Sequence, residues 1–215
     1  MRSKKTIRYT ISLGALIAVL YPIFVWLTSV DLSWDKTVVF ETFPVLGLTA
    51  FAIMWLHIVG GPFRETLEQY FDYKKFMTIS SIIVLICVIL HPLLIYVGFW
   101  LIGVKGSGFT YIPDDKQYLI WFAIVAWIIF VGYDVLKKFK STDFFVQHWQ
   151  IVKFIATLGF FLILFHSLGL GRNLQTGPLH YVWIFYGISA AVATTYTYGI
   201  QPFLKQKEQR EQTFT

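Results

Sequence analysis

Six long apolar runs alternate with short polar segments along the chain. Each run is long enough to cross a hydrocarbon core of about 30 Å as a helix, which takes about 20 residues. Helices are the open-ended structures that satisfy their own backbone hydrogen bonds in lipid. We therefore predict an all-α integral membrane protein, a six-transmembrane-helix bundle that forms a single domain over residues 1–215. The expected spans are 7–29, 43–60, 76–102, 118–136, 151–170 and 179–204.

The composition points to the same class. Hydrophobic residues make up 56% of the 215 positions and charged residues only 14%, more apolar surface than a soluble domain of this length could bury. In a soluble protein the net charge of +6 would suggest nucleic acid as a partner. Here the basic residues stand in short loops, where topology explains them, so we expect the lipid bilayer as a partner and no nucleic acid. The single cysteine, Cys87, excludes a disulfide framework and a thiolate cluster.

The loops differ in their content of basic residues. If the N-terminus is inside, fourteen of the 18 lysines and arginines fall in cytoplasmic segments and four in outer segments. Positive residues accumulate on the cytoplasmic side, so both termini are expected in the cytoplasm of a multi-pass protein of the bacterial inner membrane. The first run is too long for a signal-peptide core and lacks a cleavage site, so we interpret it as a retained span. The outer basic residues are Lys36, Lys105, Lys116 and Arg172.

Two histidines stand deep inside apolar runs. His91 lies 15 residues after the expected start of span 76–102, and His166 lies 15 residues after the expected start of span 151–170. An ionisable side chain in the membrane is costly and marks a candidate functional site. Two imidazoles at equal depth on parallel spans match the two axial positions of a b-type haem iron. Pro92 follows His91 and predicts a kink.

Other residues give weaker indications. Arg172, in the turn after His166, has the geometry to pair with a haem propionate. His57 is interpreted as a core or interfacial histidine, and His148 as a water-exposed residue of the cytoplasmic loop 137–150. The alternative to a haem site is that the buried histidines bond to each other or to carbonyl groups. The chain would then be a non-redox membrane scaffold or a transporter subunit.

Several short motifs resemble the ferric reductase-like transmembrane domain family. They are residues 47–50 (GLTA), residues 61–64 (GPFR), the third-span His91, and residues 149–153 (WQIVK) ahead of His166. The resemblance covers all six spans. It implies a cytochrome b-type bundle that holds haem between spans three and five, often as two haems stacked across the membrane.

The sequence departs from this family at the inner haem position. Lys153 stands where the family has a histidine on span five, and the matching part of span three has none, so the resemblance implies one haem b, on His91 and His166. The pattern is similar to the single-haem metalloreductases, in which a flavin occupies the inner half, and to the haem subunit of the methionine sulfoxide reductase system. Small residues (Ser80, Gly159) and cations (Arg64, Lys153) predict an FMN or FAD site there, although lysines that only set topology would look the same.

Together these features predict a transmembrane b-type cytochrome that is a component of an oxidoreductase. It would carry electrons from a cytoplasmic flavin or flavoprotein, or from a membrane quinol, to an acceptor on the outer face. The donor would be a separate reductase or the quinol, and the acceptor would be ferric or another metal ion, or a methionine sulfoxide reductase-like partner.

Overall fold

The structure is a computed structural model that describes residues 3–30, 38–104, 112–204 and 206. The expected outer connector with Asp31 and Asp35, and several basic residues of the topology argument, lie outside these ranges. Regular structure in the described residues is helical throughout, with no strand, which confirms the all-α class. The basic residues outside the described ranges are Arg2, Lys36, Lys105, Lys205, Lys207 and Arg210.

Among the described residues, five helices are long and apolar enough to cross a membrane, so the chain is a multi-pass protein of the lipid bilayer. Helix α7 is shorter than these, but it continues into a π-helical turn, Tyr196–Ile200, and then into helical residues 201–204. The short helix α3, Arg64–Leu67, follows a 3-10 turn at the end of α2. The main helices of the bundle, α7 included, are α1 Lys4–Ser29, α2 Val38–Gly60, α4 Tyr73–Leu101, α5 Tyr118–Leu136, α6 Asp143–Leu170 and α7 Pro178–Thr195.

The prediction of a long cytoplasmic loop over residues 137–150 was wrong. Residues Lys137–Phe139 form a 3-10 turn, and α6 begins at Asp143, eight residues before the expected start at 151. Asp143 in the first turn suits the positive end of the helix dipole. Trp149 is buried and lies 5.7 Å from the Tyr133 ring of α5, so packing holds these polar turns in the bundle. The bounds of α5 are those predicted.

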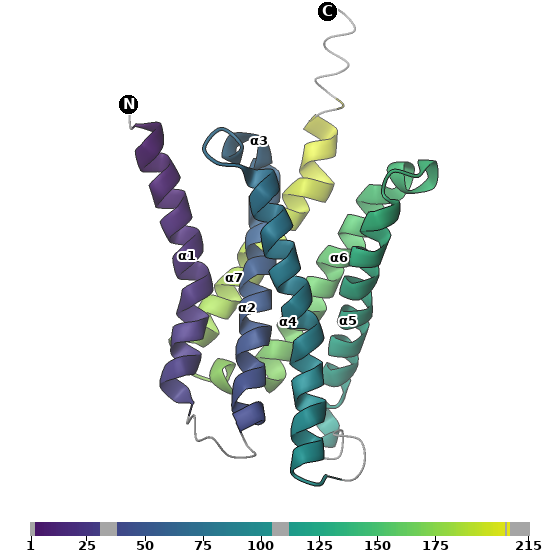
Figure 1. The fold of residues 1–215 in the computed structure, drawn as a ribbon. Coiled ribbons are helices and arrows are strands. Elements are labelled where there is room, and N and C mark those ends of the chain that lie inside the picture. The colour runs from purple at the N-terminus through teal and green to yellow at the C-terminus, as the bar shows by residue number, and fades with distance from the viewer. Residues whose placement is uncertain (1–2, 31–37, 105–111, 205, 207–215) are drawn as a thin grey trace, which may run out of the picture.

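Helix α2 is the centre of the bundle. Figure 1 shows it among its neighbours, and it packs against α1, α4, α6 and α7. Five consecutive residues, 50–54, are buried, as expected for a helix that is apolar all round. The Phe51 ring lies between the rings of Phe160 and Trp183, with 4.5 Å between centroids on each side. This stack joins α2 to α6 and α7.

Two prolines inside helices are compensated by side chains from other helices. Proline has no N–H, so the carbonyl four residues earlier loses its helical partner. Tyr186 of α7 donates its hydroxyl to the Ala18 carbonyl of α1, four residues before Pro22, at 2.8 Å. Trp127 of α5 donates its indole N–H to the Val88 carbonyl of α4, four residues before Pro92, at 3.1 Å. Helix α4 thus continues through Pro92 to Leu101, and the lost bond is replaced from outside.

Candidate functional site

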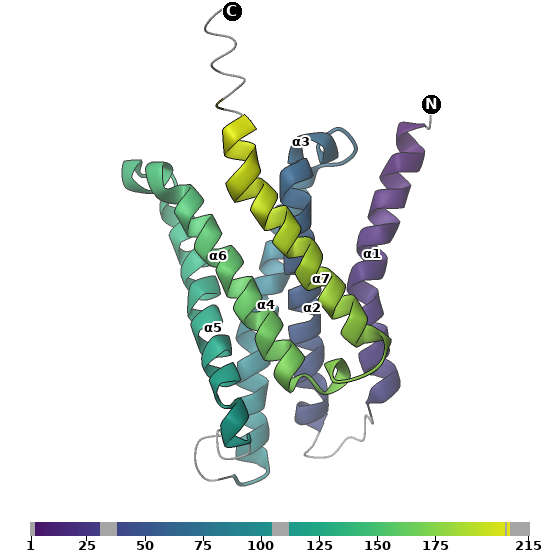
Figure 2. The ribbon, with the colours of Figure 1, turned by 180° about the vertical axis from the view of Figure 1, so that it is seen from behind.

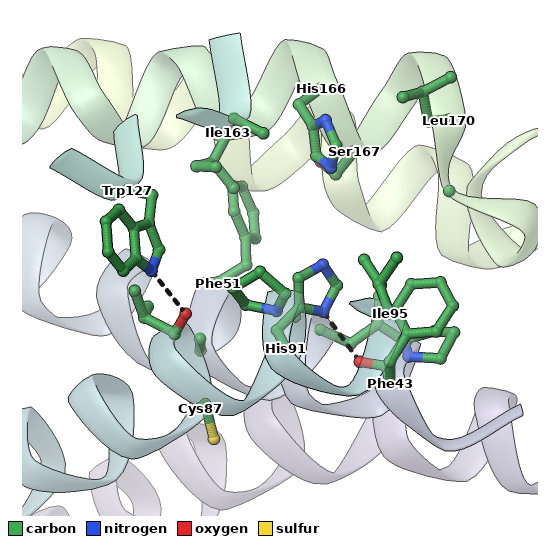
Figure 3. Close-up of a pocket in the computed structure, with 18 of the residues that line it drawn as sticks. Phe43, Phe51, Cys87, His91, Ile95, Trp127, Ile163, His166, Ser167 and Leu170 are labelled. Atoms are coloured by element: carbon green, nitrogen blue, oxygen red, sulfur yellow. Dashed lines mark hydrogen bonds between the residues drawn. The ribbon is translucent and has the colours of Figure 1, made fainter. Parts of the chain in front are cut away.

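A cavity of about 920 Å³ lies between two pairs of helices. Helix α2 packs extensively on α4, and α5 packs extensively on α6, whereas α4 and α6 hardly touch. The volume is near the upper end of the range for ligand sites, roughly 300–1,000 Å³. The walls are mostly apolar, and Figure 3 shows the side chains that line them. Apolar lining residues include Phe43, Phe51, Ile95, Trp127, Ile163, Leu170 and Trp183.

His91 lines this cavity from α4, and its ring is held by α2. Its Nδ1 atom lies 2.9 Å from the carbonyl oxygen of Phe43. A carbonyl can only accept, so Nδ1 carries the hydrogen and the neutral ring keeps a lone pair on Nε2. The Phe43 ring contacts the imidazole edge-on, with 5.2 Å between centroids. Gly47 leaves the space for the ring, because a Cβ atom there would lie 3.0 Å from Cε1 of His91.

His166 is held in the same way on the other wall. Its Nδ1 atom donates to the carbonyl oxygen of Leu119, in the first turn of α5, at 3.0 Å. The close approach of Leu119 requires Gly169, since a Cβ atom at that position would collide with the Leu119 side chain. Each histidine on one helix of a pair is therefore oriented by a backbone carbonyl on the other helix of that pair.

Both Nε2 atoms belong to one cavity. Figure 3 shows the His91 and His166 rings on opposite walls. Within the part of the chain that the structure describes, neither Nε2 atom has a hydrogen-bond partner. His91 lies 18 residues into α4 and His166 lies 23 residues into α6, so the two histidines are not equally far from the starts of their helices. The shared cavity, and not the matching count, brings the two histidines together.

Arg172 lies at the rim of the cavity, where it pairs with Glu41. The guanidinium donates Nη1 to Oε1 at 3.1 Å and Nη2 to Oε2 at 2.6 Å, a bidentate contact. The hydrogen bond to Glu41 is the largest effect on the pKa of Arg172 and raises it. Partial burial lowers this pKa, and the negative charge of Glu41 raises it further. Trp26 donates its indole N–H to the Glu41 backbone carbonyl at 2.7 Å, which fixes this end of α2 against α1.

Three of the residues expected at an inner flavin site have contacts with neighbouring protein groups. The Ser80 hydroxyl donates to the Phe76 carbonyl at 2.6 Å and lies 2.7 Å from Nε2 of His57. Gly159 faces the side chains of Ile129 and Phe130 on α5. Arg64 pairs with Glu68 on the exposed surface of α3, at 2.8 Å.

None of these three residues lines the described cavity, and neither does Lys153, which stands on α6 one turn before Thr157. His148, expected in a loop, lies in the second turn of α6 and stacks on Phe144. His57 has the hydrogen-bonded setting expected of a core histidine.

The donor set of the cavity suits a haem better than a metal ion held by protein ligands alone. Among the described residues, no group of three or more His, Cys, Asp and Glu side chains comes together. Two imidazoles whose Nε2 atoms have no partner among the described residues, facing each other across an apolar space, could hold a haem iron between them. Ligand histidines almost always give their other ring N–H to a carbonyl, a carboxylate or water, as His91 and His166 do.

Comparisons with protein-family models, with curated proteins and with solved structures found no match. The case for a site in this chain therefore rests on its own geometry.

Proposed function

We propose that this chain is a transmembrane b-type cytochrome with one haem b held between His91 and His166. The observation that carries the proposal is the matched orientation of the two rings. Each Nδ1–H is fixed on a backbone carbonyl, and each Nε2 atom is left to the same apolar cavity. The carbonyl bonds by themselves also fit the non-redox alternative, so the support for a ligand site is that both Nε2 acceptors face one cavity without a partner among the described residues.

The surrounding residues fit a site for electron transfer. A bound haem would supply reversible one-electron exchange, and the imidazoles of His91 and His166 would hold its iron. The carbonyl bonds from Phe43 and Leu119 fix the tautomer of each ring and increase its basicity. The aromatic and aliphatic walls give the cavity a mostly apolar lining. Arg172 stands at the rim of the cavity, where a propionate would compete with Glu41 for its guanidinium.

The proposal includes six spans, with both termini in the cytoplasm of a bacterial inner-membrane protein. The first turn of α1 and the helical residues 201–204 lie at the same end of the bundle in Figures 1 and 2, as an even number of passes requires. In this scheme α7 and its continuation form the sixth span. The same end also holds α3, the start of α4 and the turn after α5, with Arg64, Lys74, Lys75, Lys137, Lys138 and Lys140.

In this orientation the haem lies nearer the outer face. Electrons would enter from a cytoplasmic flavin, a flavoprotein or a membrane quinol and leave to an outer acceptor. A flavin in the inner half, near Lys153, is part of the proposal, and it rests on the sequence alone.

Optical spectra of the purified protein test the haem site. The chain should show a low-spin b-type spectrum, oxidised and dithionite-reduced, with one haem per chain by pyridine haemochrome. His91→Ala and His166→Ala should each abolish the low-spin absorbance, since one imidazole cannot supply both axial bonds. His148→Ala is the matched control, because His148 lies outside the cavity, and it should keep the spectrum. A colourless protein after expression with added haem would favour a non-redox scaffold or transporter subunit. Low-spin spectra in both site variants would contradict the assignment of His91 and His166 as the haem ligands.

A further inference from the structure

The contacts that set the separation of the two imidazoles must cross between the helix pairs. His91 belongs to the α2–α4 pair and His166 to the α5–α6 pair, and α4 and α6 hardly touch. The hydrogen bond from Trp127 Nε1 to the Val88 carbonyl crosses from α5 to α4 at 3.1 Å. Both residues line the cavity, and Figure 3 shows the bond on its wall.

The position of this bond in α4 follows from Pro92. Pro92 cannot donate to the Val88 carbonyl, so that oxygen is free to accept from another helix. Val88 lies three residues before His91, on the same face of α4. A shift of Val88 relative to α5 therefore moves the imidazole of His91 with it.

The position of the bond in α5 links it to the other histidine. Leu119, whose carbonyl holds His166, lies eight residues before Trp127, close to two helical turns and about 12 Å along α5. Residues four and eight apart share a helix face, and Ala123, halfway between them, also lines the cavity. One face of α5 thus accepts a hydrogen bond from His166 at Leu119 and donates one to α4, near His91, at Trp127.

We propose that Trp127 is a positioning residue whose bond to the Val88 carbonyl sets the distance between the imidazoles of His91 and His166. The inference rests on the proposed function, because that distance matters when both Nε2 atoms bind one iron. Trp127 acts through α4 and needs no contact with the iron. The proline beside His91 then has a definite use, since it frees the carbonyl that Trp127 binds.

The variant Trp127→Phe tests this role, because it removes the indole N–H and keeps an aromatic ring in the wall. We expect a lower low-spin fraction, a shifted midpoint potential and roughly tenfold faster haem loss, the effect of one lost hydrogen bond. Trp100→Phe is the matched control: Trp100 is 72% exposed on α4, outside the cavity lining, and its replacement should change none of these.

A second variant separates positioning from stability. Trp127→Phe combined with Pro92→Ala returns a helical N–H to the Val88 carbonyl, so this acceptor is not left unpaired. The melting temperature should recover, while the potential and the low-spin fraction stay altered because the hydrogen bond between α4 and α5 is still missing. Wild-type spectra in Trp127→Phe would overturn the proposal, and so would full spectral recovery in the double variant.

A haem-independent measurement keeps the two proposals distinct. Spin labels at the exposed positions Ile89 on α4 and Ile128 on α5 report the separation of these helices. Trp127→Phe should broaden the distance distribution relative to wild type and Trp100→Phe. An unchanged distribution would contradict the positioning role even in a colourless protein, whereas a colourless wild type with the expected broadening would contradict only the haem.

Discussion

Replacing Gly47 by alanine tests how closely the fold holds His91. A Cβ atom at this position would lie 3.0 Å from Cε1 and 3.1 Å from Nδ1 of His91, whereas ordinary contacts begin at 3.4 Å. The ring would have to move by a few tenths of an ångström, which strains its bond to the Phe43 carbonyl. Overpacking of this kind costs about 2 kcal/mol. That cost corresponds to roughly thirtyfold weaker retention of a ligand that needs the ring in place.

The assay is the haem content and low-spin absorbance of purified Gly47→Ala beside Gly132→Ala. Gly132 stands inside α5, and a Cβ atom there would meet nothing within 4 Å. Both changes replace a helical glycine by alanine, so the gain in helix propensity is matched. We expect Gly132→Ala to keep the wild-type spectrum and Gly47→Ala to lose haem during purification. Equal haem content in the two variants would refute the inference that contact with Gly47 fixes the imidazole.

Three further predictions follow from the site and the topology. Gly169→Ala should weaken haem retention as Gly47→Ala does, because a Cβ atom would displace Leu119 and the carbonyl that holds His166; a wild-type spectrum would contradict this. A membrane-impermeant thiol reagent should label Asp115→Cys in sealed cells and Ser141→Cys only after permeabilisation, and the reverse pattern would invert the proposed direction of electron flow. Added flavin should accelerate haem reduction in the wild type and less in Lys153→Ala; acceleration by a quinol alone would place the donor in the membrane.

The class of fold was predictable because lipid leaves few solutions for a long apolar run. The start of α6 could not be predicted, because the polar residues Asp143, Gln147 and His148 are more typical of a loop than of a membrane span. These turns are helical because Trp149 packs on Tyr133, a contact made by two helices that the apolar pattern treats separately. The hydrophobic periodicity and the composition describe one helix at a time, so they do not reveal a contact between two helices.

The two histidines of the site could be found from the sequence, but the groups that orient them could not. A backbone carbonyl has the same chemistry at every position, so nothing marks those of Phe43 and Leu119, which lie 48 and 47 residues from their histidines. Trp127 left one trace, because Pro92 implies an unpaired carbonyl that some donor must satisfy. The pairing of Arg172 with Glu41, 131 residues away, likewise depends on the fold.

The poor contact between α4 and α6 has a consequence for how the protein accumulates in a cell. Side chains on facing cavity walls gain little dispersion energy from each other across a space of this size. A cofactor that binds only the folded chain would add about 2.7 kcal/mol of stability at one hundred times its dissociation constant. Proteases remove membrane proteins according to how often they unfold. On the proposed function, cells starved of haem should therefore lose the polypeptide itself and not store an empty form, so that haem synthesis would set the abundance of the cytochrome.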